Sequence, residues 1–310
     1  MKNLDKLLKN RDQNSPVTVF FQHESPYYHW EYIDYRKKNG FYNYTMTYRL
    51  DSEIPWPYFT LFELMCMEKE RAIRSAQRKK QSISSINELE AHSPKSFFSL
   101  PLTYNATSKK SKKILAVISN CNNKERIRMI SILQKNIKTP DGKRAIDFYG
   151  ACSQNPKKVE KLENLRAQYK FYLAFENSKC LDYITEKFWY TILAKSVPIV
   201  YGTTRERYEL LAPKSSFIHV DDFGSLKKLA KHLTLLLNDD SEYSKYFHWR
   251  YEYNLDKEIE KLKFADQNGQ DEQGLCRLCQ LTIDPERNVV SSLEKFWYGD
   301  KKNKTCDRKL

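Results

Sequence analysis

The segment from Tyr169 to Gly202 constrains the fold more than any other part of the chain. It contains two short apolar runs, Phe171–Phe175 and Val197–Val200, each suited to a buried strand. Apolar residues at helical spacing lie between them, and we expect a helix that opens at Tyr183 with Asp182 as its cap. A strand, a helix and a strand of this length form a parallel crossover. The segment therefore predicts an α/β fold.

Polar residues gather where such a fold binds ligands. Glu176 and Asn177 follow the first strand, and Glu186 and Lys187 lie in the first turn of the predicted helix. Ligands of open α/β sheets bind at the carboxyl ends of strands, beside helix amino termini. We therefore expect these four residues to converge on one crevice. The alternative is that Glu186 and Lys187 are ordinary first-turn charges on a solvated helix, where acidic residues are favoured anyway.

The same segment carries the motifs FYLAFENS, DYITEKFW and VPIVYG, which closely resemble the donor-binding signature of the α-1,3-fucosyltransferases. These enzymes carry fucose from GDP-fucose to a sugar hydroxyl. Other elements similar to the family's occur in its order: HESP at 23–26, YNYTMTYRLDSEIPWPY at 42–58, AVISNC at 116–121, DFYGAC at 147–152 and the CxxC of Cys276 and Cys279. The resemblance covers about positions 17–300.

The resemblance implies the GT-B architecture, in which two Rossmann-like α/β domains face a cleft. We place the acceptor-side domain at 1–112, with a Ser-, Pro- and Lys-rich linker near 91–113. The GDP-fucose-binding donor domain, with the CxxC segment, is placed at 113–310. The resembled enzymes have an anchor, a stem and further sequence ahead of the HESP-like element, whereas this chain has only about two dozen residues there. We therefore expect an incomplete first domain and a chain shortened at its amino terminus.

Fucosyl transfer needs a general base that removes the proton of the acceptor hydroxyl while GDP leaves from the opposite face of the sugar. Glu24 follows the apolar run Val17–Phe21 and precedes several aromatic residues, surroundings that suit a carboxylate to this role. The resemblance assigns the base to Glu24. A strand-end glutamate in a loop hydrogen bond is the alternative. His23 is the less favoured base, because a histidine at a strand end is more often packed or surface-exposed.

Departure of GDP leaves negative charge on the β-phosphate, which cations and helix amino termini stabilise. The resemblance supplies the donor-site candidates Arg126, Tyr172, Asn177, Glu186 and Lys187. Arg126 and Lys187 match positions at the phosphates, and Glu186 matches the position that holds the ribose hydroxyls. A one-residue slip would exchange Arg126 for Arg128. Tyr172 matches a position near the guanine or ribose, but an aromatic residue in a strand is usually core.

Three residues of the 42–58 element, Tyr48, Arg49 and Asp51, are candidates for the acceptor side. A structural Arg–Asp pair and a contact with the acceptor are both compatible with the pattern. No metal site is predicted, because the adjacent acidic pairs Asp221–Asp222 and Asp239–Asp240 do not form a DxD motif. We expect GDP-fucose as the donor substrate and no essential cofactor, which leaves room for stimulation by a divalent cation.

The composition fits a secretory enzyme. At 310 residues and 40% hydrophobic content, the chain supports about two domains with real cores. Its net charge of +14 is dispersed, apart from runs at 69–80 and 109–113, and no nucleic-acid-binding signature accompanies it. Nucleic acid is therefore not an expected partner. No stretch approaches the ~20 apolar residues that span a bilayer.

Seven cysteines are present, an odd number, so at least one is unpaired or pairs outside the chain. Disulfides are expected if the chain is luminal, since a lone CxxC is a weak indication of zinc. Three Asn-x-Ser/Thr triplets agree with the secretory pathway and are candidate glycosylation sites: Asn43, Asn105 and Asn303.

These observations predict an inverting α-1,3-fucosyltransferase that acts on an N-acetylglucosamine hydroxyl of glycoprotein or glycolipid glycans. Its full-length parent is expected in the Golgi lumen as a type II membrane protein, with a membrane anchor that this sequence does not contain. The alternative is a truncated, inactive protein of the same fold that binds the donor or a glycan. A basic nucleic-acid-binding protein is a weaker third interpretation.

Overall fold

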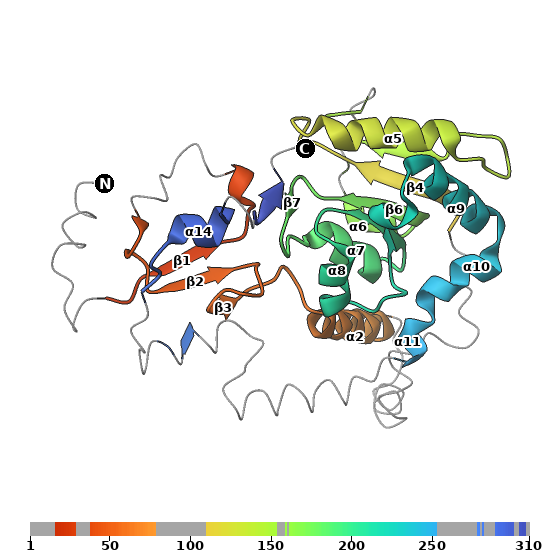
Figure 1. Cartoon of the computed structure of the whole chain (residues 1–310). Helices are drawn as coiled ribbons and strands as arrows, with labels where there is room; N and C mark the ends of the chain where they lie inside the picture. The colour runs from red at the N-terminus through yellow and green to blue at the C-terminus, as the bar shows by residue number, and fades with distance from the viewer. Residues whose placement is uncertain are drawn as a thin grey trace. The chain divides into compact units, whose positions relative to one another are not determined.

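The computed structural model describes residues 16–28, 38–78, 110–153, 159, 161–252, 278–279, 281, 289–300 and 304–307. The chain divides into two compact units. The first comprises Met1–Tyr58, Cys180–Tyr183 and Lys261–Arg308, and the second comprises Phe59–Lys179, Ile184–Glu260 and the last two residues. Each contains a parallel sheet, so the predicted α/β class is confirmed in both (Figure 1).

The second unit is built on a five-stranded parallel sheet (Figure 1). In sheet order its strands are β5 (Ile146–Tyr149), β4 (Lys112–Val117), β6 (Tyr169–Phe175), β8 (Val197–Tyr201) and β9 (Ile218–His219). Its helices are α2 (Leu61–Arg78), α5 (Lys124–Asn136), α6 (Leu162–Arg166), α7 (Glu186–Leu193), α8 (Arg205–Leu211), η3 (Val220–Phe223), α9 (Leu226–Asn238), α10 (Asp240–Ser244), η4 (Lys245–Phe247) and α11 (Trp249–Glu252).

The central strand β6 is apolar on both faces because helices cover both sides of a parallel sheet. Phe171, Leu173 and Phe175 point into the largest core cluster, together with Leu133 of α5 and Leu233 of α9. β6 and β8 pair in register from Phe171–Val197 to Phe175–Tyr201. The crossover predicted from the sequence is therefore confirmed.

The predicted start of the crossover helix is wrong. α7 begins at Glu186, and its cap is Thr185, whose side chain accepts a hydrogen bond from the backbone N–H of Lys187. Asp182 lies before the helix in a left-handed conformation, with φ of 60°. Its carboxylate instead accepts the backbone N–H of Leu50 at 3.0 Å. A tertiary partner, absent from the local pattern, has taken the capping side chain.

The first unit contains a three-stranded parallel sheet in the order β1 (Val19–Gln22), β2 (Tyr44–Thr47) and β3 (Ile54–Pro55). It also holds η1 (Pro26–Tyr28), α14 (Leu293–Tyr298) and β10 (Cys306–Asp307), and β10 forms a two-stranded sheet with β7 (Lys179–Cys180). Leu293 and Trp297 of α14 are buried in one cluster with Phe20 of β1 and with Tyr48. The core of this unit therefore joins residues from both ends of the chain.

The two units divide the chain differently from the predicted boundary at 112. The first unit ends at Tyr58, and α2 belongs to the second unit, where Glu68 pairs with Arg250 at 3.0 Å. The terminal segment 261–308, predicted as part of the donor domain, belongs to the first unit because α14 completes its core. Most of the predicted linker near 91–113 lies outside the described residues. In the described parts of the chain, no helix is both long and apolar enough to cross a membrane.

Candidate active site

Glu176 connects the carboxyl end of β6 with the first turn of α7 in the second unit. Its carboxylate is fully buried and accepts the backbone N–H and the hydroxyl of Thr185, each at 2.9 Å. Nζ of Lys187 lies 3.1 Å from Oε2 of Glu176 and donates to Oγ1 of Thr185 at 2.8 Å. Glu176 therefore fixes the position of Lys187.

The electrostatics of this cluster keep Lys187 cationic. Burial raises the pKa of Glu176, and the ammonium of Lys187 opposes that rise. Burial lowers the pKa of Lys187, but the carboxylates of Glu176 and Glu186 outweigh burial, and the pKa is raised above its ordinary value. Oε1 of Glu186 lies 3.3 Å from Nζ, and its side chain is 42% exposed. The first turn of α7 thus presents a fixed ammonium and an accessible carboxylate, as an anion- and hydroxyl-binding site requires.

Gly202 follows the last residue of β8, and its lack of a side chain leaves space for the side chain of Glu176. A Cβ atom at this position would lie 3.0 Å from Cγ and 3.2 Å from Cβ of Glu176. Such contacts are tighter than most contacts of a Cβ atom, so the buried Glu176 side chain would have to shift by a few tenths of an ångström. The glycine is therefore part of the site's construction, although it offers no functional group.

Arg126 is buried in the first turn of α5. Its guanidinium donates to the carbonyl oxygen of Phe175 at 3.2 Å and to that of Asn120 at 2.9 Å. Arg128, by contrast, is mostly exposed and pairs with Glu125 on the surface of the helix. A shifted alignment with the family motif would have chosen Arg128 instead of Arg126. Of the two, Arg126 is the one that contacts the carboxyl end of β6.

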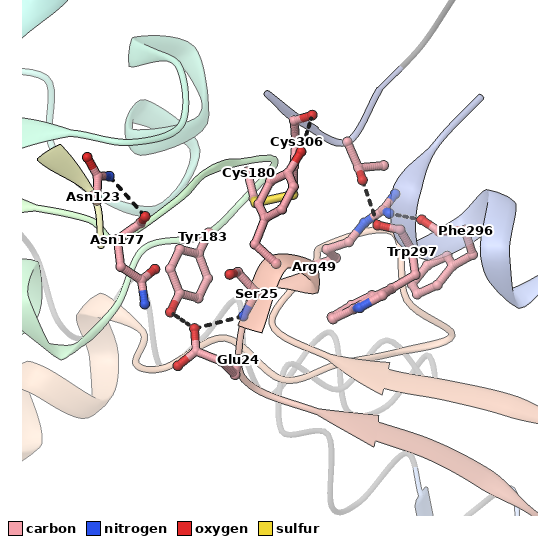
Figure 2. The surroundings of a disulfide bond; sticks show 12 residues. Glu24, Ser25, Arg49, Asn123, Asn177, Cys180, Tyr183, Phe296, Trp297 and Cys306 are labelled. Carbon is pink, nitrogen blue, oxygen red and sulfur yellow. Dashed lines mark hydrogen bonds between the residues drawn. A yellow bond between two sulfur atoms is a disulfide. The ribbon is translucent and has the colours of Figure 1, made fainter. Parts of the chain in front are cut away.

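The loops that follow β4 and β6 are tied together. Asn123 caps α5 by accepting the N–H of Arg126, and its Nδ2 donates to the carbonyl oxygen of Asn177 at 3.0 Å (Figure 2). A disulfide joins Cys121 to Cys152. Asn123 and Thr185 were not predicted as helix caps or site residues, although asparagine and threonine just before an apolar helix are typical cap residues.

Tyr172, the candidate for a position near the guanine or ribose, has a buried side chain in the structure. This side chain is 2% exposed on β6, paired with Leu115 and Pro198 of the neighbouring strands. The guanidinium of Arg166 lies 4.5 Å from its ring centre. The ring is therefore part of the interior, because both faces of a central parallel strand are covered. The site in the second unit accordingly brings together Glu176, Glu186 and Lys187, with Arg126 and Asn177 at the same end of β6.

Glu24 lies directly after β1 in the first unit, as predicted. Its Oε1 accepts the backbone N–H of Ser25 at 2.9 Å and the hydroxyl of Tyr183 at 2.5 Å (Figure 2). The ring of Tyr183 packs edge-on against Tyr48 at 5.0 Å and Tyr58 at 6.1 Å. The aromatic partner that the structure shows for Glu24 is thus Tyr183, which was assigned to a helix and missed.

His23 has a structural environment. Its Nε2 donates to the carbonyl oxygen of Trp56 at 2.8 Å, and its ring stacks on Tyr58 at 5.0 Å. Burial lowers the pKa of His23, and the bond to Trp56 opposes this in part. These contacts hold the ring on β3 and the loop that follows it, which favours Glu24 as the base.

Arg49 and Asp51 form a structural pair. Nε of Arg49 donates to Oδ1 of Asp51 at 2.8 Å, and a second bond joins Nη2 to Oδ2. The guanidinium also donates to the carbonyl oxygen of Phe296 and lies 4.4 Å from that ring's centre (Figure 2). Tyr48 is 1% exposed in the same core. These residues attach α14 to the sheet, so of the two interpretations the structural one is favoured.

The structure forms two of the expected disulfides, Cys121–Cys152 and Cys180–Cys306. Asn43 is only 8% exposed, and its Oδ1 accepts the N–H of Thr18 at 2.9 Å, so its burial disfavours a glycan there. Asn105 and Asn303 lie outside the described residues. Across the described ranges, His, Cys, Asp and Glu side chains form no cluster of three that could hold a metal ion.

Comparisons with known proteins agree on one family. Residues 107–297 match the family model described as glycosyltransferase family 10 (fucosyltransferase), C-terminal, and residues 1–59 match the model described as fucosyltransferase, N-terminal. The chain is 36% identical to a glycoprotein 3-alpha-L-fucosyltransferase A of Drosophila melanogaster, over 78% of this chain and 42% of that protein. It is also 36% identical to the 4-galactosyl-N-acetylglucosaminide 3-alpha-L-fucosyltransferase FUT6 of Homo sapiens, over 75% of this chain and 53% of that protein.

The chain thus spans about half the length of the curated relatives that it matches. Among solved structures, a crystal structure of an alpha1,3-fucosyltransferase with GDP-fucose aligns with 76% of this chain and 67% of its own chain. That alignment has a TM-score of 0.48 at 17% identity.

Proposed function

The chain belongs to glycosyltransferase family 10, the fucosyltransferases, and we propose that it transfers fucose from GDP-fucose to an N-acetylglucosamine hydroxyl, with inversion, forming an α-1,3 linkage. One observation carries the proposal. Inside the matched range 107–297, Glu176 and Thr185 hold the ammonium of Lys187 at the first turn of α7, where a nucleotide diphosphate would bind.

The donor side of the mechanism follows from the charges of this cluster. As the bond between fucose and the β-phosphate breaks, negative charge grows on the phosphate oxygen. Lys187 is already cationic and positioned by Glu176, so it stabilises that charge without reorganisation. Arg126 supplies a second cation at the end of β6, and the exposed carboxylate of Glu186 accepts hydrogen bonds from the ribose hydroxyls.

The acceptor side rests on Glu24. Its carboxylate takes the proton of the attacking hydroxyl, and the fucose carbon is attacked on the face opposite to GDP, which inverts its configuration. The hydroxyl of Tyr183 and the N–H of Ser25 both donate to Oε1 and so fix the orientation of the carboxylate. In this scheme the first and second units, each with a parallel β-sheet, correspond to the acceptor and donor domains of a GT-B enzyme.

The names of the two relatives indicate a class of acceptor. One acts on glycoproteins and the other on a galactosyl-N-acetylglucosaminide. The proposal therefore includes glycans of glycoproteins or glycolipids as acceptors and the Golgi lumen as the compartment. It assigns charge stabilisation to Lys187 and Arg126 and needs no cofactor, although stimulation by a divalent cation is compatible with it.

The test is transfer of labelled fucose from GDP-fucose to a panel of N-acetylglucosamine-containing glycans, with linkage and anomeric configuration read by NMR. We expect an α-1,3-linked product. Binding of GDP-fucose without any transfer, from folded protein, would instead support the inactive donor-binding alternative. No binding of GDP-fucose would overturn the proposal.

A further inference from the structure

The loop Cys180–Tyr183 is assigned to the first unit, whereas the chain on both sides of it belongs to the second. Within the first unit this 180–183 loop has a contact at every residue. Cys180 forms a disulfide with Cys306, and the N–H of Leu181 donates to the carbonyl oxygen of Thr305 at 2.7 Å. Asp182 accepts from Leu50, and Tyr183 donates to Glu24.

The backbone of the 180–183 loop is held in an uncommon conformation. Asp182 has a φ of 60°, in the left-handed region that residues other than glycine seldom adopt. Such a conformation persists when the surroundings fix it. The hydrogen bond from the N–H of Leu50 to the Asp182 carboxylate, at 3.0 Å, is one such constraint, and the disulfide two residues earlier is another. The direction in which Tyr183 projects is therefore set by the contacts of the residues that precede it.

The carboxyl-terminal strand that holds this loop is itself anchored. The hydroxyl of Thr305 donates to the carbonyl oxygen of Trp297 at 2.6 Å, and Trp297 is fully buried in α14. The hydroxyl of Tyr27 donates to the carbonyl oxygen of Cys306 at 3.2 Å. A continuous set of contacts thus runs from the core at Trp297, through the disulfide, to the hydroxyl of Tyr183 (Figure 2).

We propose that the Cys180–Cys306 disulfide is a positioning device for the base of the proposed reaction, and that Tyr183 is the positioning residue through which it acts. The proposal rests on the proposed function, since it takes Glu24 as the base. With the loop fixed, Tyr183 donates its hydrogen bond to Oε1 and holds the carboxylate that accepts the proton in one orientation. Breaking the disulfide releases the loop, and with it this donor.

Other titratable groups lie around Tyr183 and Glu24 and also affect how activity depends on pH. Tyr48 packs on Tyr183, and its electrostatic partners include Arg49, Tyr58, Glu24 and Asp182. Burial raises the pKa of Tyr48 well above its ordinary value. Tyr48 therefore stays neutral under ordinary conditions. The imidazole of His23 stacks on Tyr58, and burial lowers its pKa. His23 is left unchanged in every variant that is compared.

The first test compares Tyr183→Phe and the double variant Cys180→Ser, Cys306→Ser with the unaltered protein across pH. We expect kcat near neutral pH to fall about tenfold in each, the loss of one hydrogen bond to a charged group. The fall should be present at every pH at which the unaltered protein is active, because the lost hydrogen bond orients the carboxylate at all of them. The KM for GDP-fucose should change less than about twofold, a scale far below the tenfold expected for kcat.

The matched control is the other disulfide. Removing it with Cys121→Ser, Cys152→Ser costs a cross-link of the same kind in the second unit, near Asn123 and Arg126. This control should leave kcat nearly unchanged. An equal fall of kcat in the control, or an unchanged kcat in Tyr183→Phe, would overturn the positioning role.

A second measurement separates this inference from the proposed function. Hydrogen–deuterium exchange of the peptide that contains residues 181–185 is followed before and after mild reduction of the folded protein. Faster exchange at Leu181 and Tyr183 after reduction supports the disulfide as the restraint, even if no fucose is transferred. Exchange that is unchanged by complete reduction of Cys180–Cys306 would overturn it, whatever the activity.

Discussion

Nζ of Lys187 lies 3.1 Å from Oε2 of Glu176, and the Glu176 side chain is completely buried. This ion pair affects both function and stability. It holds the ammonium in one place. Removing the ammonium lowers the free energy of unfolding, because the buried carboxylate then has no counter-charge. Function and stability are therefore coupled at this position, and an experiment must measure both.

Lys187→Ala should weaken GDP-fucose binding about 10- to 100-fold, the value of a charge-assisted contact of about 1.5–3 kcal/mol. The same change should lower the free energy of unfolding by about 3 kcal/mol, because the Glu176 carboxylate loses its partner. Calorimetric titration and denaturant melts on the same samples measure the two effects. The double variant Glu176→Gln, Lys187→Met removes the uncompensated charge and keeps the binding test possible if the single variant does not fold.

Lys245→Ala is the matched control, since Lys245 is an exposed lysine paired with Glu242 across one helical turn. It should leave donor affinity and stability nearly unchanged. Donor affinity that is unchanged in Lys187→Ala would mean that this lysine only closes a structural ion pair.

Glu24→Gln should reduce turnover about 10²–10⁴-fold, the usual contribution of a general base. The amide keeps the size of the side chain, and its oxygen still accepts from Tyr183 and Ser25, but it no longer accepts a proton. GDP-fucose affinity should change little, because the proposed donor cluster around Lys187 belongs to the other unit. Steady-state kinetics with varied donor give both values. If the variant keeps most of its turnover, another group takes the proton, and His23 is the next residue to substitute.

Gly150→Ala should destabilise the protein by at least about 2 kcal/mol, which combines backbone strain with a steric clash. Gly150 has a φ of +91°, and a Cβ there would lie 2.4 Å from the backbone oxygen of Ile118. Gly142→Ala is the control, since Gly142 has a φ of +65° but nothing within 4 Å of the added atom. It should cost only about 1 kcal/mol. Equal effects in denaturant melts would show that the contact with Ile118 is relieved by local movement.

Lys110 should make stability depend on pH in the alkaline range. Burial lowers the pKa of Lys110 to about 7, and its Nζ donates to the carbonyl oxygens of Ala167 and Ala194 and to Ser196. Between that value and the unfolded pKa near 10.4, the unfolded chain binds more protons than the folded one. Stability should therefore rise with pH in this window, by at most about 1.4 kcal/mol per pH unit, and gain nothing below it.

The measurement is a series of denaturant melts from pH 6 to pH 10. Lys110→Met should flatten the slope, whereas Lys113→Met should preserve it, because Lys113 pairs with the exposed Asp141 at the surface. A slope that survives in Lys110→Met would assign the pH dependence to other groups.

The crossover from β6 to β8 could be predicted because its cause is local. Apolar runs at Phe171–Phe175 and Val197–Val200, separated by a helical spacing, leave few other folds open. The same reasoning failed at Asp182, where the capping side chain is taken by Leu50, a residue more than a hundred positions away in the sequence. For Tyr172 the sequence left a donor contact and a core position open, and the structure shows a buried side chain on β6.

The two compact units differ from the predicted domains for a similar reason. A change of composition marks the stretch from 91 to 113, but it does not show that α14 returns to pack on Phe20 and Tyr48. The resemblance identified Glu24, Glu186 and Lys187 as candidate site residues. The structure shows which residues hold two of them in place: Tyr183 for Glu24, and Glu176 with Thr185 for Lys187.

The return of α14 to the first unit has a consequence for how the protein is made. The second unit takes its described elements from 59–179 and 184–260, so all of them have been synthesised well before the last residues emerge from the ribosome. The core of the first unit must wait for Leu293 and Trp297, and the closing disulfide must wait for Cys306. Phe20 and its neighbours are thus exposed for most of translation, a period in which apolar surfaces recruit chaperones or aggregate. A premature stop codon that removes only the last few dozen residues would leave the second unit intact. The first unit, which carries Glu24, would lack part of its core.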